Sequence, residues 1–126
     1  MKHRLILAGS LIAGSLLVGG CGAGSAADAS GGPPAVTVVG TDTMRYAPDT
    51  INVKAGEATT IAFKSGGLVP HDLISEGATK NLRMVNVTPG KQQTGVFEAD
   101  KPGTYAFYCS QARHREAGMV GKIVVS

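Results

Sequence analysis

The sequence has no tryptophan, few charged residues and no long helical pattern after residue 35. Charged side chains make up 17% of the 126 residues, and Lys2 and Arg4 account for two of the three units of net positive charge. The rest of the chain lacks the basic surface that binds nucleic acid, so we expect no nucleic-acid partner. Eighteen glycines and six prolines, set among short runs of Val, Ile and Thr, instead favour many short strands joined by tight turns.

The first residues have the anatomy of an export signal. Met1–Arg4 is basic, and Leu5–Val18 is apolar but too short for a comfortable transmembrane helix, which predicts a signal peptide over residues 1–20. The Gly-Gly-Cys that follows resembles a bacterial lipobox, so Cys21 is the expected lipidation site and membrane anchor. The alternative is cleavage near residues 27–29, where Ala-Asp-Ala would give a soluble exported product. We expect an exported protein, lipid-anchored to a bacterial membrane and facing the periplasm or the cell exterior.

The remainder of the chain reads as a tether and one domain. Residues 21–34, rich in Gly, Ala and Ser, are expected to hold the lipidated cysteine and a flexible tether, and residues 35–126 to form a single all-β domain. Short alternating segments between turn signals predict a Greek-key β-sandwich of about seven to eight antiparallel strands. The expected strands lie at 35–40, 46–56, 57–67, 71–75, 94–98, 103–109 and 120–126. Residues 76–90 are less regular, which suggests a short helix or an irregular loop.

Thiols and imidazoles are scarce, and their small number limits the roles that Cys109 can have. Without the leader, and with Cys21 acylated, the chain keeps one thiol, Cys109, and two imidazoles, His71 and His114. A single thiol cannot form an internal disulfide in an oxidising compartment. Cys109 is therefore an inert buried residue, a metal ligand or a nucleophile.

The spacing C-x4-H-x4-M brings Cys109, His114 and Met119 into one short segment. On a helix, at about 100° per residue, steps of five would scatter the three side chains around the axis. A strand ending at Cys109, a loop carrying His114 and a strand starting after Met119 would instead bring them together. With His71 they form a soft ligand set that serves calcium and magnesium poorly and suits copper in both common oxidation states.

Three separated segments resemble plastocyanin-like cupredoxins: YAPDTINVKAGEATTIAFKSGG, SGGLVPHDLI and GTYAFYCSQARHREAGMVGKIVVS. The resemblance implies a cupredoxin fold and a blue, type 1 site with one copper per chain that alternates between Cu(I) and Cu(II). Its ligands would be His71, Cys109, His114 and Met119. Four residues separate the cysteine from the second histidine, a spacing more similar to that of azurins and auracyanins. The family commonly has Asn after the first histidine. Asp72 stands there in this chain, and its carboxylate can accept hydrogen bonds from Ser110 and so join the two ligand loops.

These residues predict a monomeric carrier of single electrons between a donor and an acceptor redox protein, not an enzyme. A binuclear copper centre would need a second cysteine where Arg113 stands, and the chain has no His-x-His pair. Arg113 and Arg115 could steer an anionic partner or be ordinary solvated charges. We expect Met44 and Met84 to pack in the core. A copper chaperone and a metal-free scaffold lipoprotein are the alternatives; a chaperone would favour an open, Met-rich site, and the complete ligand set argues against a metal-free scaffold.

Overall fold

The computed structural model describes residues 32–126. The predicted signal peptide, Cys21 and most of the tether therefore lie outside the described residues. Among residues 32–126, no helix is long and apolar enough to cross a membrane. The described part of the chain is built from strands and turns, as the turn-rich composition predicts.

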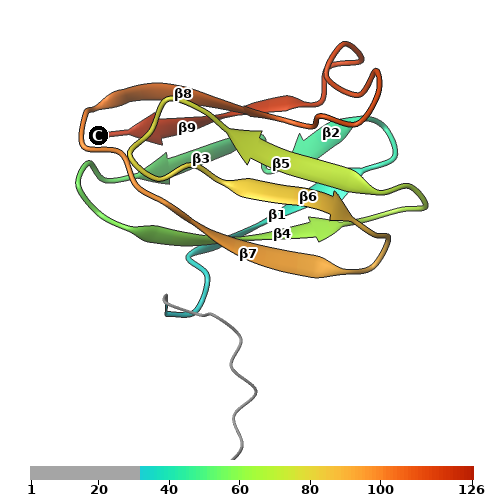
Figure 1. Cartoon of the computed structure of the whole chain (residues 1–126), viewed down its shortest axis with the longest axis horizontal. Helices are drawn as coiled ribbons and strands as arrows, with labels where there is room; N and C mark the ends of the chain where they lie inside the picture. Colours follow the sequence, from blue (N-terminus) through green and yellow to red (C-terminus); the bar gives the residue numbers. More distant parts are fainter. Residues whose placement is uncertain (1–31) are drawn as a thin grey trace, which may run out of the picture.

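Within residues 32–126, nine strands form two sheets that face each other (Figure 1). One sheet has the order β2-β1-β4-β7, and the other has the order β3-β9-β8-β5-β6. Five of the strand pairs are antiparallel, whereas β1–β4 and β3–β9 are parallel. The bounds are β1 Val36–Thr41, β2 Arg45–Ala47, β3 Thr50–Val53, β4 Thr59–Ser65, β5 His71–Ser75, β6 Arg83–Val87, β7 Gln92–Phe97, β8 Gly103–Tyr108 and β9 Val120–Val125.

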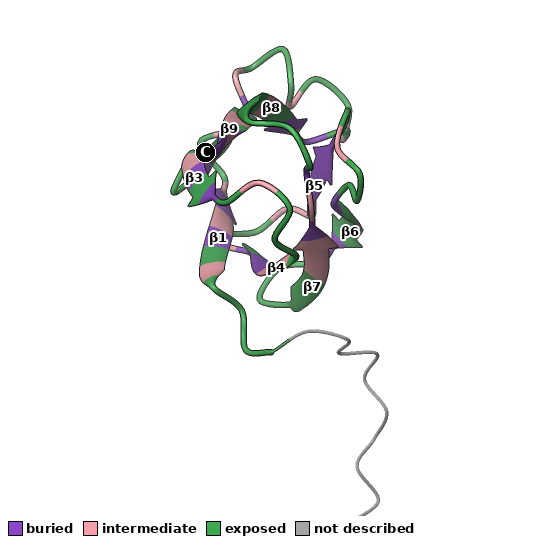
Figure 2. Ribbon diagram, turned by 90° about the vertical axis from the view of Figure 1, so that its left-hand side faces the viewer, coloured by how far each residue is buried: buried purple, intermediate pink, exposed green. Residues whose placement is uncertain are grey.

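The core lies between the sheets, and the buried segments of the strands enclose it (Figure 2). In β4, Ile61 and Phe63 are fully buried and face the core, and Lys64 on the other face is exposed, although Ala62 on that face is buried as well. Met84 is 1% exposed, and Met44 packs against the same cluster, so both methionines serve packing as predicted. The predicted all-β sandwich is confirmed.

Three details differ from the sequence-based expectation. The strands are expected to be antiparallel, whereas the pairs β1–β4 and β3–β9 are parallel. The extended region expected over 46–56 is split into β2 and β3, which belong to different sheets, with Pro48 between them. The expectation of a helix or irregular loop over 76–90 is wrong, because this stretch contains β6. Its alternation is hard to recognise, since the pairing of β6 with β5 shifts register and Asn86 has a φ of 51°.

The sheet order places the predicted site residues at one end of the sandwich. β5 and β8 are adjacent, with Ile74 opposite Tyr108, and β8 pairs with β9. His71 begins β5, Cys109 follows β8 directly, and Met119 directly precedes β9. Because antiparallel neighbours bring the start of one strand beside the end of the next, the three residues meet at the same edge. The loop between β8 and β9 lies at this end of the sandwich (Figure 1).

Candidate metal centre

The β8–β9 loop carries three of the four predicted ligands and is closed by its own backbone. The Cys109 amide donates to the Met119 carbonyl at 3.2 Å, and the Met119 amide donates to the His114 carbonyl at 3.0 Å. These bonds turn the segment back toward β5, where the fourth predicted ligand, His71, is fully buried. The strand-loop-strand arrangement expected from the C-x4-H-x4-M spacing is therefore present.

Donor atoms of His71, Cys109 and His114 converge on one point. Their ligand atoms lie within 4.8 Å of one another. The two Nδ1 atoms are 3.3 Å apart, and Sγ of Cys109 is 3.4 Å from Nδ1 of His114. His71 and Cys109 are fully buried, whereas His114 is partly exposed. One sulfur and two ring nitrogens that lie this close together can bind a soft metal cation between them.

Met119 is also fully buried and lies beside His71. A Cβ placed on Gly40 would stand 3.0 Å from Cε of Met119 and 3.2 Å from Cβ of His71. The glycine in β1 therefore leaves the room in which the end of the thioether side chain and the first histidine meet. The structure thus brings all four predicted ligand residues to one end of the sandwich, with three donor atoms clustered and the methionine packed next to them.

The thiol of Cys109 is both desolvated and hydrogen-bonded. Burial and the charge of Asp72 raise the pKa of Cys109, and they outweigh the backbone N–H groups of Asp72 and Gln111, which act to lower it. The Asp72 amide lies 3.2 Å from the sulfur. An N–H group that donates to sulfur favours the thiolate, which is the form that binds metal.

The first histidine is biased toward its neutral form. Burial lowers the pKa of His71, and the charge of His114 lowers it further, whereas Asp42 and Asp72 act in the opposite direction. Neutral imidazole is the form that binds a metal ion. The environment of His71 therefore favours ligation over protonation.

Asp72 joins the two ligand-bearing segments. Its carboxylate accepts hydrogen bonds from the hydroxyl of Ser110, from Nε2 of Gln111 at 3.0 Å and from the amide of Asn86 at 2.6 Å. Burial raises the pKa of this carboxyl, but these hydrogen bonds outweigh burial and the pKa is lowered overall. The hydroxyl of Tyr46 donates to the Asp72 carbonyl at 2.5 Å. Asp72 is thus held by residues of β2, of β6 and of the β8–β9 loop, which we call the metal loop because it carries three of the predicted ligands.

Arg45 holds the far end of the same loop. Its Nη1 donates to the carbonyl of Ala117 at 2.7 Å and to that of Met44 at 2.8 Å. Gly118 has a φ of 101°, and a Cβ there would lie 2.5 Å from Nη1 of Arg45. A residue with a side chain at position 118 would therefore be strained and would displace the guanidinium.

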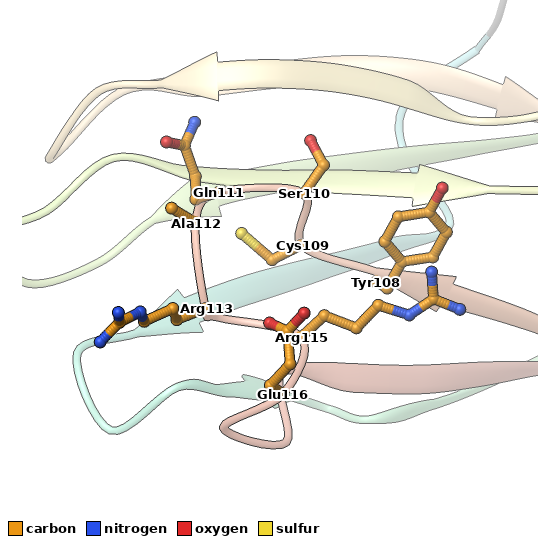
Figure 3. Close-up of a pocket in the computed structure, with 8 residues that line it drawn as sticks. All are labelled: Tyr108, Cys109, Ser110, Gln111, Ala112, Arg113, Arg115 and Glu116. Carbon is orange, nitrogen blue, oxygen red and sulfur yellow. The ribbon is translucent and has the colours of Figure 1, made fainter.

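A shallow pocket of about 260 Å³ lies over the loop next to Cys109 (Figure 3). In the figure, the Arg115 side chain runs toward Tyr108, and Arg113 points away from it. The guanidinium of Arg115 lies 4.1 Å from the centroid of the Tyr108 ring, and the Tyr108 hydroxyl donates to Glu76 at 2.6 Å. Both arginines are exposed, and Arg115 is also held against an aromatic ring.

Several supporting residues could not be recognised in the sequence. Tyr46, Asn86 and Arg45 act on the site from strands that are remote along the chain, and their contacts depend on sheet order. Gln111 carried the clearest signal, because it lies inside the predicted loop next to Ser110. Asp42, which lies 3.9 Å from Nε2 of His71, carried none.

Comparisons with known proteins agree with this architecture. The model of the cupredoxin-like domain family matches residues 12–125. The copper-resistant cuproprotein CopI of Rubrivivax gelatinosus is 33% identical over 120 residues, which cover 81% of this chain and 72% of the relative. A plastocyanin of Prochlorothrix hollandica is 34% identical over 125 residues, which cover 91% of this chain and 85% of the relative. The reduced auracyanin of Roseiflexus castenholzii has a TM-score of 0.62 at 21% identity, with 76% of this chain and 99% of the auracyanin covered.

The chain therefore belongs to the cupredoxin-like domain family, and the resemblance expected from its sequence is confirmed. The cluster of one thiol and two imidazoles fits the trigonal His, His, Cys plane of a type 1 copper site. Family and donor set together identify the cofactor as a single copper ion.

Removing the Asp72 carboxylate should destabilise the folded domain even without metal. Asp72→Ala leaves the Asn86 amide without its acceptor and releases Ser110 and Gln111. Each hydrogen bond to a charged group is worth about 1.5–3 kcal/mol, and because the three are coupled we expect a total loss of about 3 kcal/mol. Urea unfolding of the metal-free domain measures this loss.

The matched control is Asp100→Ala, which removes an exposed aspartate that accepts one hydrogen bond, from Thr79. Its cost should stay below about 1 kcal/mol. Equal losses for the two variants would show that Asp72 does not join the ligand segments.

Proposed function

We propose that His71, Cys109, His114 and Met119 bind one copper ion and that the domain carries single electrons between redox proteins. The observation that carries this proposal is the convergence of three ligand atoms within 4.8 Å at the buried end of the sandwich. Bound copper supplies a one-electron couple between Cu(I) and Cu(II). The chain supplies the ligands, their orientation and the exclusion of water.

The residues around the predicted ligands hold those ligands in fixed positions. His71 is fixed at the start of β5, Cys109 accepts the Asp72 amide, and Arg45 holds the loop before Met119. Ligands that are already in place need to move little when the charge of the site changes by one unit, which favours fast transfer. His114 is the partly exposed ligand, so we propose its ring edge as the point of contact with donor and acceptor.

The surface next to the predicted ligands is better suited to docking a protein than to binding a small substrate. The pocket beside Cys109 has a volume of about 260 Å³, below the roughly 300–1,000 Å³ typical of small-molecule sites. The partners that we propose are therefore two redox proteins, and the carrier acts as a monomer. Arg113 is exposed at the rim of this pocket and could steer an anionic partner.

We further propose that the protein is exported and anchored. In this scheme, residues 1–20 are removed, Cys21 is lipidated, residues 22–34 form the tether and residues 35–126 form the cupredoxin domain. The anchor would hold the carrier at a bacterial membrane, on the periplasmic or outer side. A tether of about a dozen residues would let it reach partners near that surface.

Copper handling is the second candidate function, because one relative is a copper-resistant cuproprotein. A protein that sequesters or delivers copper could use the same ligands. The difference lies in release, since delivery needs an ion that leaves readily. Two of the three clustered ligands are fully buried, and this burial favours a carrier that retains its ion.

Adding Cu(II) to the metal-free domain should produce an intense blue colour that disappears on one-electron reduction, because thiolate ligation gives type 1 sites this absorption. Cys109→Ser should abolish the colour and leave the β-sheet circular dichroism intact. Met84→Leu, a core substitution of similar volume, is the matched control and should stay blue. A colourless complex of the parent domain would overturn the proposal.

Copper release separates the two candidate functions. With a competing chelator in excess, a carrier should lose its ion over hours or longer, because His71 and Cys109 are buried. Loss within seconds would favour copper delivery. The decay of the blue absorbance after chelator addition measures the rate.

The anchor can be tested in cells of the bacterial source. Cys21→Ser removes the thiol that lipidation requires, so the protein should move from the membrane fraction to the soluble fraction or keep an uncleaved leader. Immunoblotting of fractionated cells measures this shift. A variant distributed like the parent would show that Cys21 is not the anchor.

A further inference from the structure

One ring nitrogen of the site has no partner. Nε2 of His71 is the single buried side-chain nitrogen or oxygen atom, among residues 32–126, that lacks a hydrogen bond. Buried polar groups in native proteins are nearly always hydrogen-bonded, and an unsatisfied one destabilises the fold. The atom belongs to a fully buried side chain, so an explanation must come from its neighbours.

The carboxylate of Asp42 lies next to this nitrogen. Oδ1 of Asp42 is 3.9 Å from Nε2 of His71. Asp42 follows β1 directly, so it comes from the sheet opposite to the one that contains His71. It is the only acidic group that the structure places within 4.0 Å of a ligand imidazole in the described part of the chain.

The carboxylate of Asp42 is held in place by the loop between β4 and β5. Both of its oxygens accept the amide of Leu68, at 3.0 and 2.9 Å. Gly67 has a φ of 83°, and a side chain there would collide with the Asp42 carboxyl group. The loop between β4 and β5 therefore leaves space for this carboxylate at Gly67, close to the point where the loop ends at His71.

The two nitrogens of the His71 ring face different groups. Nδ1 lies 3.3 Å from Nδ1 of His114 and points into the donor cluster, while Nε2 points toward Asp42. When Nδ1 binds a metal ion, the remaining ring proton must be on Nε2, which then becomes an obligatory donor. A distance of 3.9 Å is too long for a hydrogen bond, and a shift of about 1 Å closes it.

We propose that Asp42 is the positioning residue for the first histidine: its carboxylate accepts a hydrogen bond from the Nε2 N–H group, fixes the ring with Nδ1 toward the donor cluster and lowers the reduction potential of the bound copper. This inference rests on the proposed function, because it concerns the same ligand. A carboxylate that accepts from a ligand imidazole raises the basicity of that ligand. Its negative charge also favours Cu(II), the more positive of the two oxidation states.

A purely structural role would be different. Asp42 could serve only to hold the β4–β5 loop through the Leu68 amide. In that case, its charge would have no effect on the ligand, and only loss of the acceptor would matter. Asp42→Asn separates the two roles, because the amide oxygen still accepts from Leu68 while the negative charge is gone.

The test compares the copper-loaded parent with Asp42→Asn by protein-film or solution voltammetry. We expect the variant to stay blue and to favour Cu(I) about tenfold more than the parent does, which for a one-electron couple is an increase in potential of about 59 mV. Its Cu(II) affinity should fall about tenfold, the lower limit for loss of an outer partner of a metal ligand. Asp100→Asn is the matched control. It removes the same charge beyond the far end of β8, about 20 Å away, and should leave the potential unchanged.

A second measurement does not depend on the variant folding. In the diamagnetic Cu(I) form of the parent, the Nε2 proton of His71 should give a strongly downfield NMR signal, as expected for donation to a carboxylate. Absence of that signal, or an Asp42→Asn protein with normal colour and unchanged potential, would overturn the role of Asp42 and leave the proposed function intact. A parent domain that binds no copper would instead overturn the proposed function.

Discussion

The carboxylate of Asp72 is the interaction on which the arrangement of the site depends. A buried carboxylate is costly unless its oxygens are satisfied, and here donors come from the metal loop and from the backbone of β6. The same residue contributes its amide to Cys109 and its carbonyl to Tyr46. One residue next to the first histidine thus links that histidine to the thiol, to the metal loop and to the opposite sheet.

The fold makes this link possible by its strand order. β5 lies between β8 and β6, so residues at the start of β5 can reach the metal loop on one side and Asn86 on the other. The opposite sheet contributes Gly40, Tyr46 and Arg45, which make room for Met119, hold Asp72 and fix the loop. Both sheets therefore position the site, although all four predicted ligands come from β5 and the β8–β9 segment.

The sequence predicted the fold class and the segments of the site because these depend on local patterns. Alternation identified β4 and β8, and the scarcity of thiols and imidazoles drew attention to Cys109 and His114. The stretch that contains β6 was misjudged, because a register shift and the positive φ of Asn86 interrupt its alternation. Contacts of Arg45, Tyr46 and Asp42 with the site could not be predicted, since they depend on which strands of the two sheets face each other.

The two imidazoles are buried to different extents, so the predicted metal site can be approached from the side of one histidine only. His71 is sealed inside the sandwich, and His114 reaches the surface from the loop. If the proposed function is correct, the metal ion enters and electrons are exchanged at the same surface, next to His114. A redox partner seated over His114 would then also shield the ion from competing chelators, so each encounter that moves an electron would briefly protect the carrier from losing its cofactor.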